Sequence, residues 1–290
     1  MASSTRTLKM DASRAATLKA ALENAGFAFG SAPHTTFTAK GDGVSIAYYT
    51  SGKLVLQGKE ITAFLDRFVS ECGTGSAIAR EALVGADESG KGDYFGPLVC
   101  AAVALTPEMS QFLDEVPLRD SKTLSPRDIA EAADTLRKVL PYEIVMIGPA
   151  KYNELYPKFR NVNTLLAWAH AKAITSVVAK SGVKKVLLDK FCEEHVVVRA
   201  LGPLAAEIDF SMRVRAEAEP AVAAASILAR DAFVRGLKSL EREIGHPLPP
   251  GAGSPTEKAA VSLVRTLGEA MLPRVAKMHF RTTEKILSRV

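Results

Sequence analysis

Residues 83–98 read LVGADESGKGDYFGPL, and the order of residue types in this stretch predicts both a strand and a site. The apolar residues 83–86 form the predicted strand, which runs directly into the adjacent carboxylates Asp87 and Glu88 and then into a Ser-Gly-Lys-Gly segment. Neighbouring residues of a regular strand face opposite sides of a sheet, so both acids can serve one site only if the strand pairing stops or bulges here. The glycines favour such a break. Taken alone, the stretch also fits a solvated acidic turn.

From about residue 82 onward, apolar strands alternate with helical segments. The predicted strands are residues 83–86, 98–105, 143–147, 185–188 and 208–214, and the predicted helices include residues 126–139, 163–180 and 220 to about 244. Pro220 suits the first turn of the last of these helices. This alternation predicts an α/β sheet.

Two further acids occupy positions comparable to the first pair. Asp189 ends the predicted strand 185–188, and Glu217 lies between a predicted strand and the helix that opens at Pro220. Neighbouring strands can deliver such residues to one edge of a sheet. Asp189 could instead cap a helix near Phe191, and Glu217 could interact only with the positive end of its helix.

Oxygen-only acidic clusters suit Mg²⁺ or Mn²⁺, whereas zinc would favour cysteine or histidine, which these segments lack. Carboxylates packed together raise one another's pKa unless a cation compensates them. Two divalent ions about 3.5–4 Å apart can activate a water and stabilise the departing oxygen of a phosphodiester. Convergence of the four acids therefore predicts a metal-dependent phosphodiester hydrolase.

The first part of the chain has a different pattern. Residues 1–72 predict a small α+β unit, with a helix that begins near Asp11 or Ser13, three short strands at residues 34–40, 44–49 and 53–57, and a closing helix at residues 61–71. Glycine-rich turns separate the strands, as in a β-meander. We expect residues 73–81 to form a linker and residues 82–290 to form the larger domain.

Composition narrows the class of protein. The 290 residues carry a net charge of +5, with a pI near 9.0, which favours polyanionic partners. Cys72, Cys100 and Cys192 are odd in number and form no CxxC pair, which argues against a disulfide framework. The start lacks an apolar leader, and the most apolar stretch, residues 98–105, is far shorter than the roughly 20 residues that span a bilayer. We expect a cytoplasmic protein with no membrane association.

The motifs of the chain resemble, segment by segment, those of the type 3 ribonucleases H. The matching segments are residues 85–98, Arg119-Asp120-Ser121-Lys122, Tyr152-Asn153, residues 161–163 with His170, residues 188–191, Ala216-Glu217 and residues 223–230. Chance agreement over so many separated segments is very improbable.

This resemblance implies a ribonuclease H-like fold with a five-stranded mixed sheet flanked by helices. It implies a catalytic and metal-binding set of Asp87, Glu88, Asp189 and Glu217 that uses Mg²⁺ or Mn²⁺, without an organic cofactor, to cut the RNA strand of an RNA–DNA hybrid duplex. The products would carry 5′-phosphate and 3′-hydroxyl ends. Residues 1–72 are similar to the family's TATA-binding-protein-like domain, which binds substrate. We expect a monomer.

Three features separate the chain from the sister type 2 family, which has an arginine in the glycine loop, an aspartate as fourth acid and a late tyrosine. Here the corresponding residues are Lys91 and Glu217, and no tyrosine follows Tyr156. Incision at a single embedded ribonucleotide is therefore expected to be poor. The alternatives are a type 2-like enzyme that acts at single ribonucleotides and a non-catalytic nucleic-acid-binding protein.

The resemblance also implies substrate contacts. The candidates are Ser89, Gly90, Lys91, Gly92, Ser121, Lys122, Asn153 and His170. Glycine lets the backbone approach a nucleic-acid strand closely, and a contact to the 2′-hydroxyl would distinguish RNA from DNA. Lys91 could instead be a solvated loop residue, Lys122 a member of a surface ion pair, and His170 a packing residue of its helix.

Overall fold

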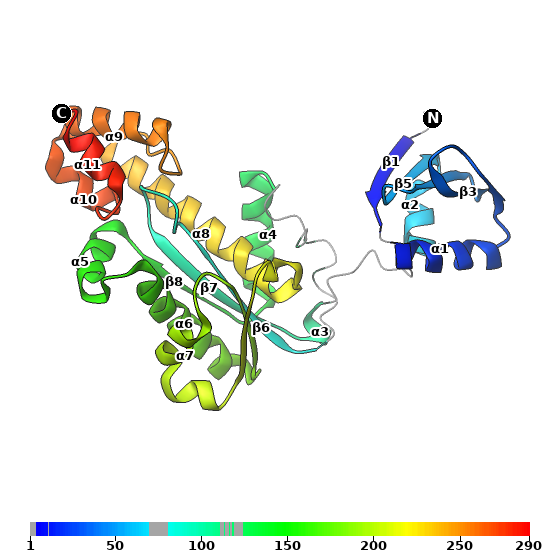
Figure 1. Cartoon of the computed structure of the whole chain (residues 1–290), viewed down its shortest axis with the longest axis horizontal. Coiled ribbons are helices and arrows are strands. Elements are labelled where there is room, and N and C mark those ends of the chain that lie inside the picture. Colours follow the sequence, from blue (N-terminus) through cyan, green and yellow to red (C-terminus); the bar gives the residue numbers. More distant parts are fainter. Residues whose placement is uncertain are drawn as a thin grey trace. The chain divides into compact units, whose positions relative to one another are not determined.

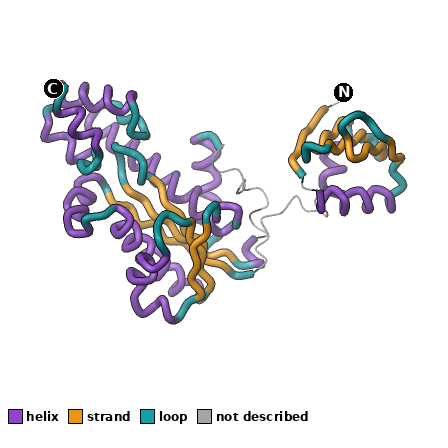
Figure 2. The backbone as a smooth tube through the Cα atoms, in the orientation of Figure 1, coloured by secondary structure: helices purple, strands orange, loops and turns teal. Residues whose placement is uncertain are grey.

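The computed structural model describes residues 4–10, 12–69, 81–110, 113, 116, 118 and 124–290. The chain divides into two compact units, Met1–Ser76 and Ala77–Val290, each with an apolar core of its own (Figure 1). Each unit contains one five-stranded sheet, and Figure 2 shows the helices that accompany each sheet. Residues 73–80 of the predicted linker lie outside the described residues.

The first unit is an antiparallel sheet covered by helices. Its elements are β1 (Ser4–Lys9), α1 (Ala12–Asn24), β2 (Ala28–Gly30), β3 (Thr35–Gly41), β4 (Val44–Tyr49), β5 (Lys53–Gly58), α2 (Ile61–Phe64) and a π-helical turn, Leu65–Val69. The strand order is β1-β5-β4-β3-β2. The three predicted strands are confirmed as β3, β4 and β5, while β1 and β2 were not predicted.

Local sequence explains this sheet. Asp42 and Gly43 both have positive φ, 49° and 73°, which gives the two-residue turn that joins β3 to β4. Along β4 and β5, buried residues alternate with partly or fully exposed ones, so that one face carries the core. The buried face packs Leu54 and Leu56 against Leu18 and Leu22 of α1. The side chains on the other, open face are partly or fully exposed within this unit.

The second unit is built on a mixed sheet of order β10-β9-β6-β7-β8. Its strands are β6 (Leu83–Ser89), β7 (Leu98–Leu105), β8 (Tyr142–Ile147), β9 (Lys185–Asp189) and β10 (Asp209–Arg213). The pairs β6–β7 and β7–β8 are antiparallel, and β6–β9 and β9–β10 are parallel. The predicted five-stranded mixed sheet is confirmed.

Helices cover both faces of this sheet (Figure 1). They are α3 (Pro107–Ser110), α4 (Pro126–Val139), α5 (Pro149–Phe159), α6 (Val162–Ser181), α7 (Glu194–Leu201), α8 (Pro220–Ile244), α9 (Ser254–Leu267), α10 (Leu272–Val275) and α11 (Arg281–Leu287). All eight residues of β7 are buried, as expected for a strand covered on both sides. Val99, Ala101 and Val103 pack on the α8 side, whereas Ala102 and Ala104 pack on the α6 side.

The helix ends follow from their sequences. The Ser125 side chain caps α4 by accepting a hydrogen bond from the Asp128 amide, and Asn161 caps α6 in the same way through the amide of Asn163. Gly182 and Gly245, with φ of 72° and 65°, end α6 and α8 in the left-handed conformation that glycine tolerates. The predicted bounds of α4 and α8 are confirmed.

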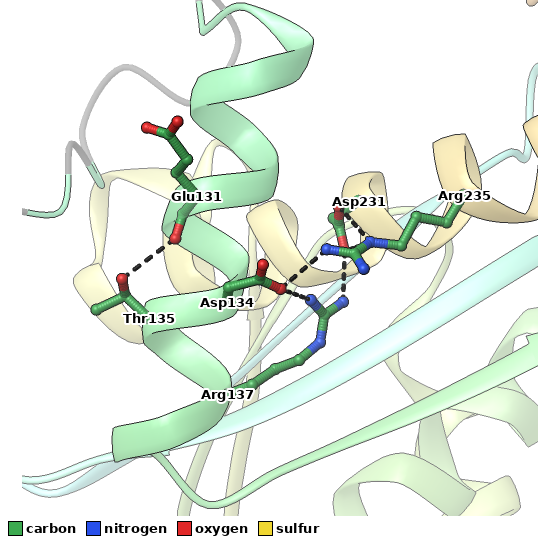
Figure 3. Close-up of polar contacts among 6 residues, drawn as sticks. All are labelled: Glu131, Asp134, Thr135, Arg137, Asp231 and Arg235. Atoms are coloured by element: carbon green, nitrogen blue, oxygen red, sulfur yellow. Dashed lines mark hydrogen bonds and ion pairs between the residues drawn. The ribbon is translucent and has the colours of Figure 1, made fainter.

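An ion network fastens α4 to α8 (Figure 3). Asp231 of α8 is 3% exposed and pairs with both Arg137 of α4 and Arg235. Asp134 of α4 joins the network through Arg235, at 2.9 Å, and Arg137, at 3.1 Å. Two aspartates and two arginines thus balance one another, which compensates the buried charge of Asp231.

The helices that the sequence did not predict are α3, α5, α7 and those after residue 250, namely α9, α10 and α11. Among the described helices, none is both long and apolar enough to cross a lipid bilayer.

Candidate active site

Asp87 and Glu88 lie near the end of β6, and their side chains project from opposite faces of the sheet. Asp87 points toward α8, where the Ser226 side chain hydrogen-bonds it. Glu88 points toward α6, where His170 Nε2 lies 3.1 Å from Glu88 Oε2. The opposite orientation is what regular strand geometry requires.

The pairing of β6 with its neighbouring strands stops near Asp87 and Glu88 on one side only. On the β7 side, the ladder continues through Glu88 and Cys100 to Ser89 and Val99. On the β9 side, it ends at Ala86, opposite Leu188. The expectation of a break is therefore correct for one neighbour and wrong for the other, because the antiparallel pairing with β7 persists through both acids.

Asp189 lies beside Asp87 at the sheet, and Glu217 lies in the segment that contacts Asp189. Asp189 follows Leu188 in β9, so it is the neighbour of Asp87 just beyond the last parallel pair. Its Oδ1 accepts a hydrogen bond of 2.8 Å from the amide of Ala216. Glu217 is the next residue, within a short 3₁₀ turn (Ala216–Ala218) that leads into α8. Asp189 is thus not the cap of α7, which begins five residues later with Glu193 as its N-cap.

The pKa of Asp87 shows the effect of burial and of neighbouring acids. Burial raises the pKa of Asp87 to about 6, and the charges of Glu88 and Asp189 act in the same direction. Hydrogen bonds from Ser226 and from the amide of Glu88 oppose this rise. A cation at the cluster would relieve the repulsion.

Lys91 lies over the Glu88 side of the cluster. Its Nζ is 3.9 Å from Glu88 Oε1, donates a 3.5 Å hydrogen bond to the carbonyl of Phe191, and lies 5.0 Å from the centroid of the Phe191 ring. The side chain is 34% exposed. Lys91 is therefore tied to the acids and is not simply a solvated loop residue.

The glycines of this region occupy their positions for different structural reasons. A Cβ at Gly90, where φ is 86°, would meet the carbonyl oxygen of Pro97 at 2.2 Å, so this glycine is required by the fold. Gly92 is exposed, and a Cβ there would meet nothing within 4 Å. Gly85 lies on the α8 side of β6, where a Cβ would meet Ala221 and Val222 at 2.2 Å. Only Gly92 leaves open space for a close approach by a ligand.

The C-terminal segment holds the loop that follows β6. Lys277, which is fully buried, donates from Nζ to the carbonyls of Asp93 (2.7 Å), Gly96 (2.8 Å) and Phe95 (3.4 Å). Burial lowers the pKa of Lys277 to about 7. Three carbonyl acceptors match the three donors of an ammonium group, so the side chain cross-links residues 93–96 to the end of the chain.

Replacing Lys277 with methionine is expected to lower the free energy of unfolding by about 3 kcal/mol, because the buried carbonyls of the loop lose their donor. Lys285→Met is the matched control, since Lys285 makes an exposed ion pair with Glu257 and should change stability by less than about 1 kcal/mol. Urea unfolding of both variants measures the difference. Equal stabilities would contradict the cross-linking role of Lys277.

The side-chain polar groups of Asn153 and one ring nitrogen of His170 are bound within the protein. Asn153 Nδ2 donates to the carbonyls of Ala276 (2.8 Å) and Pro273 (3.0 Å), and its Oδ1 accepts from the amide of Met278 at 2.9 Å. These bonds join α5 to the C-terminal segment. His170 is 0% exposed and bonded to Glu88, so its full burial leaves no surface for a substrate.

Ser121 and Lys122 lie outside the described residues, as do Arg119 and Asp120. The sequence prediction missed Ser226, Lys277 and Cys100. A polar residue within the apolar run of α8 was the available signal for Ser226, whereas Lys277 and Cys100 gave none.

Comparison with known proteins relates this site to a family. The family profile described as Ribonuclease HII matches residues 84–283, which include all four acids, and one described as a domain of unknown function (DUF3378) matches residues 6–74. A Ribonuclease HIII of Protochlamydia amoebophila is 42% identical over 277 residues, which cover 93% of this chain and 92% of the relative. The chain belongs to the ribonuclease HIII family.

Other ribonuclease HIII proteins are also similar to this chain. That of Chlamydia abortus is 40% identical, with 93% of each chain covered. The crystal structure of Bst-RNase HIII in complex with Mn²⁺ is similar with a TM-score of 0.70, 27% identity and 99% of each chain covered. That of Aquifex aeolicus RNase H3 is similar with a TM-score of 0.59, 32% identity and coverage of 95% and 100%. The resemblance inferred from the motifs is confirmed.

The donor set of this ribonuclease HIII site fits a hard divalent cation, because carboxylate oxygens predominate at its edge. Within the described ranges, no group of three or more Asp, Glu, His or Cys side chains is already arranged to hold a metal ion. Mg²⁺ commonly keeps several waters and takes substrate phosphates as ligands, so a complete protein cage is not required.

Proposed function

We propose that the chain is an endoribonuclease that hydrolyses the RNA strand of RNA–DNA hybrids by two-metal-ion catalysis at Asp87, Glu88, Asp189 and Glu217. The products would carry 5′-phosphate and 3′-hydroxyl ends. The observation that supports the proposal is that Asp87 and Asp189 directly follow the last parallel pair of β6 and β9, while Glu88 follows Asp87 in β6 and Glu217 follows Ala216, whose amide bonds Asp189. We further propose that the protein acts in the cytoplasm as a monomer.

Asp87 and Asp189 would be the central ligands of Mg²⁺ or Mn²⁺, with Glu88 and Glu217 on the flanks. A related protein, Bst-RNase HIII, has been crystallised with Mn²⁺, which supports this choice of cation. Bound cations would activate the attacking water and stabilise the departing oxygen. The amide of Ala216 holds one oxygen of Asp189, and the amide of Glu88 holds one of Asp87, so the protein fixes the direction of both carboxylates.

The scissile strand would approach over Gly92, the glycine of the loop with open space around it. Lys91, partly exposed and 3.9 Å from Glu88, would contact a phosphate near the acids. Ser89 and the backbone of Gly90 border the same approach, and backbone groups of this loop would touch the 2′-hydroxyl. Ser121 and Lys122 remain predicted phosphate contacts.

The open face of the first sheet would bind the hybrid. Pairing brings Lys40, Ser45 and Gln57 into one row across β3, β4 and β5, and Lys53 begins β5. Among the described residues of these strands, the face opposite the core carries no Asp or Glu. A row of small and polar side chains with lysines favours a phosphate backbone.

The experiment compares three end-labelled duplexes: a hybrid with a run of ribonucleotides, a DNA duplex with one ribonucleotide, and an all-RNA duplex. With Mg²⁺ or Mn²⁺, we expect cleavage of the RNA strand of the first and poor cleavage of the other two. Preferred incision at the single ribonucleotide would support a type 2-like specificity instead. Failure to cut any duplex would support a binding protein.

Glu217→Gln is expected to lower hybrid cleavage at least about tenfold while the melting temperature changes little, because this half-buried residue lies in a three-residue turn and not in the core. Glu219→Gln is the matched control, since Glu219 pairs with Arg213 on the exposed side and should leave cleavage unchanged. Steady-state kinetics and thermal melts of both variants provide the test. A large loss of melting temperature with cleavage retained would contradict the assignment.

A further inference from the structure

The two oxygens of Glu88 have different partners. Oε2 lies 3.1 Å from Nε2 of His170, inside the protein, and Oε1 lies 3.9 Å from Nζ of Lys91, on the side of the acidic cluster. The Glu88 side chain is 13% exposed and the His170 side chain 0%. One oxygen is thus bound in the interior, and the other faces Lys91.

His170 is itself held on several sides. It lies in the middle of α6, where the other buried side chains are apolar. Its ring stacks on Phe191, with centroids 5.3 Å apart and an interplanar angle of 24°. Cys100, the β7 residue opposite Glu88, lies beside it within interaction distance. Because an ionised carboxylate only accepts hydrogen bonds, the His170 Nε2 that faces Glu88 carries a proton.

Packing alone does not explain a histidine here. A ring buried among alanines and leucines of α6 could be phenylalanine, which would bring no polar atoms into the interior. The histidine instead places a ring nitrogen, Nε2, on a carboxylate of the site.

We propose that His170 is a positioning residue, whose Nε2–H holds Oε2 of Glu88 so that Oε1 is presented to the cation and the scissile strand. The proposal rests on the function proposed above and deepens it. Groups that orient metal ligands in this way typically change metal affinity or activity by about 10–100-fold when they are removed.

Two substitutions separate positioning from packing. His170→Gln keeps a donor, because the Gln Nε2 amide reaches about as far from the backbone as the imidazole Nε2. His170→Phe keeps the ring and its stacking on Phe191 but has no donor for Glu88. The positioning role predicts that the glutamine variant is closer to wild type in function, whereas a packing role predicts that the phenylalanine variant is.

The measurement is the dissociation constant for Mn²⁺ of the full-length, substrate-free protein, followed by the electron paramagnetic resonance signal of free Mn²⁺. We expect His170→Phe to weaken Mn²⁺ binding by about 10–100-fold and His170→Gln by less than about threefold, with kcat/KM for the hybrid in the same order. Melting temperatures should not follow this order. If the phenylalanine variant fails to fold, His170→Leu serves as the second variant without a donor.

A phenylalanine or leucine variant that binds Mn²⁺ as wild type does, or better than the glutamine variant, would overturn the proposal. Asp189→Asn, measured in parallel, distinguishes this from failure of the proposed function. If Asp189→Asn binds Mn²⁺ as tightly as wild type does, the assignment of the metal site itself is wrong. If it does, the order of the His170 variants decides the positioning role alone.

Discussion

Asp87→Asn and Asp189→Asn are each expected to lower cleavage of an RNA–DNA hybrid by about a thousandfold or more, which corresponds to about 4 kcal/mol of transition-state stabilisation. Each substitution removes the charge of a proposed metal ligand and keeps an oxygen that can accept the existing amide hydrogen bond. Since burial disfavours the charged form of Asp87, the neutral side chain should leave the melting temperature at or above that of wild type.

Single-turnover cleavage with Mg²⁺, together with hybrid binding and thermal melts, measures these effects. Asp209→Asn is the matched control, because Asp209 is an exposed aspartate at the start of β10 and should leave cleavage unchanged. Near wild-type turnover by Asp87→Asn or Asp189→Asn would contradict the assigned site.

Removal of residues 1–76 is expected to raise KM for the hybrid about tenfold or more, while single-turnover cleavage at saturating substrate is largely preserved. The deletion takes away the open sheet face with Lys40 and Lys53, together with the nearby Lys59, and spares all four acids. Loss of two or three phosphate contacts should also reduce the slope of log affinity against log salt by about two or three.

The point variants Lys40→Gln with Lys53→Gln test the same face in the full-length chain. Lys19→Gln is their control, because Lys19 lies on α1, pairs with Glu23 and is not on the open face. Unchanged KM and salt slope for the deletion, with a sharply lower melting temperature, would indicate that the first unit only stabilises the second.

The sequence carried enough local information to predict the strand that ends at Asp189 and the strand that leads into Asp87, although β6 continues as far as Ser89. An apolar run that stops at an acid is visible without tertiary structure, and so are a proline at the start of α8 and a glycine after its end. The two-residue turn at Asp42 and Gly43 was predictable for the same reason, since the turn chemistry lies in the turn itself.

The supporting contacts were not predictable in this way. Lys277 lies 184 residues from Asp93, and nothing in its neighbours indicates a buried lysine bound to three carbonyls. Asn153 shares a motif with substrate-binding segments, but its side chain is occupied by a segment 120 to 125 residues away. The role of His170 depends on the register of the sheet, because the pairing of β6 with β7 determines that Glu88 faces α6.

The central claim is that these acids hydrolyse RNA with the help of a divalent cation, and a metal titration tests it most directly. Protein freed of metal by chelation is mixed with end-labelled hybrid, and the cleavage rate is followed as Mg²⁺ or Mn²⁺ is added, for wild type and Asp189→Asn side by side. We predict no cleavage before the cation is added, a saturable rise for wild type, and about a thousandfold lower rate for the variant. Cleavage by wild type that is independent of added cation, or equal rates for the two proteins, would contradict the claim.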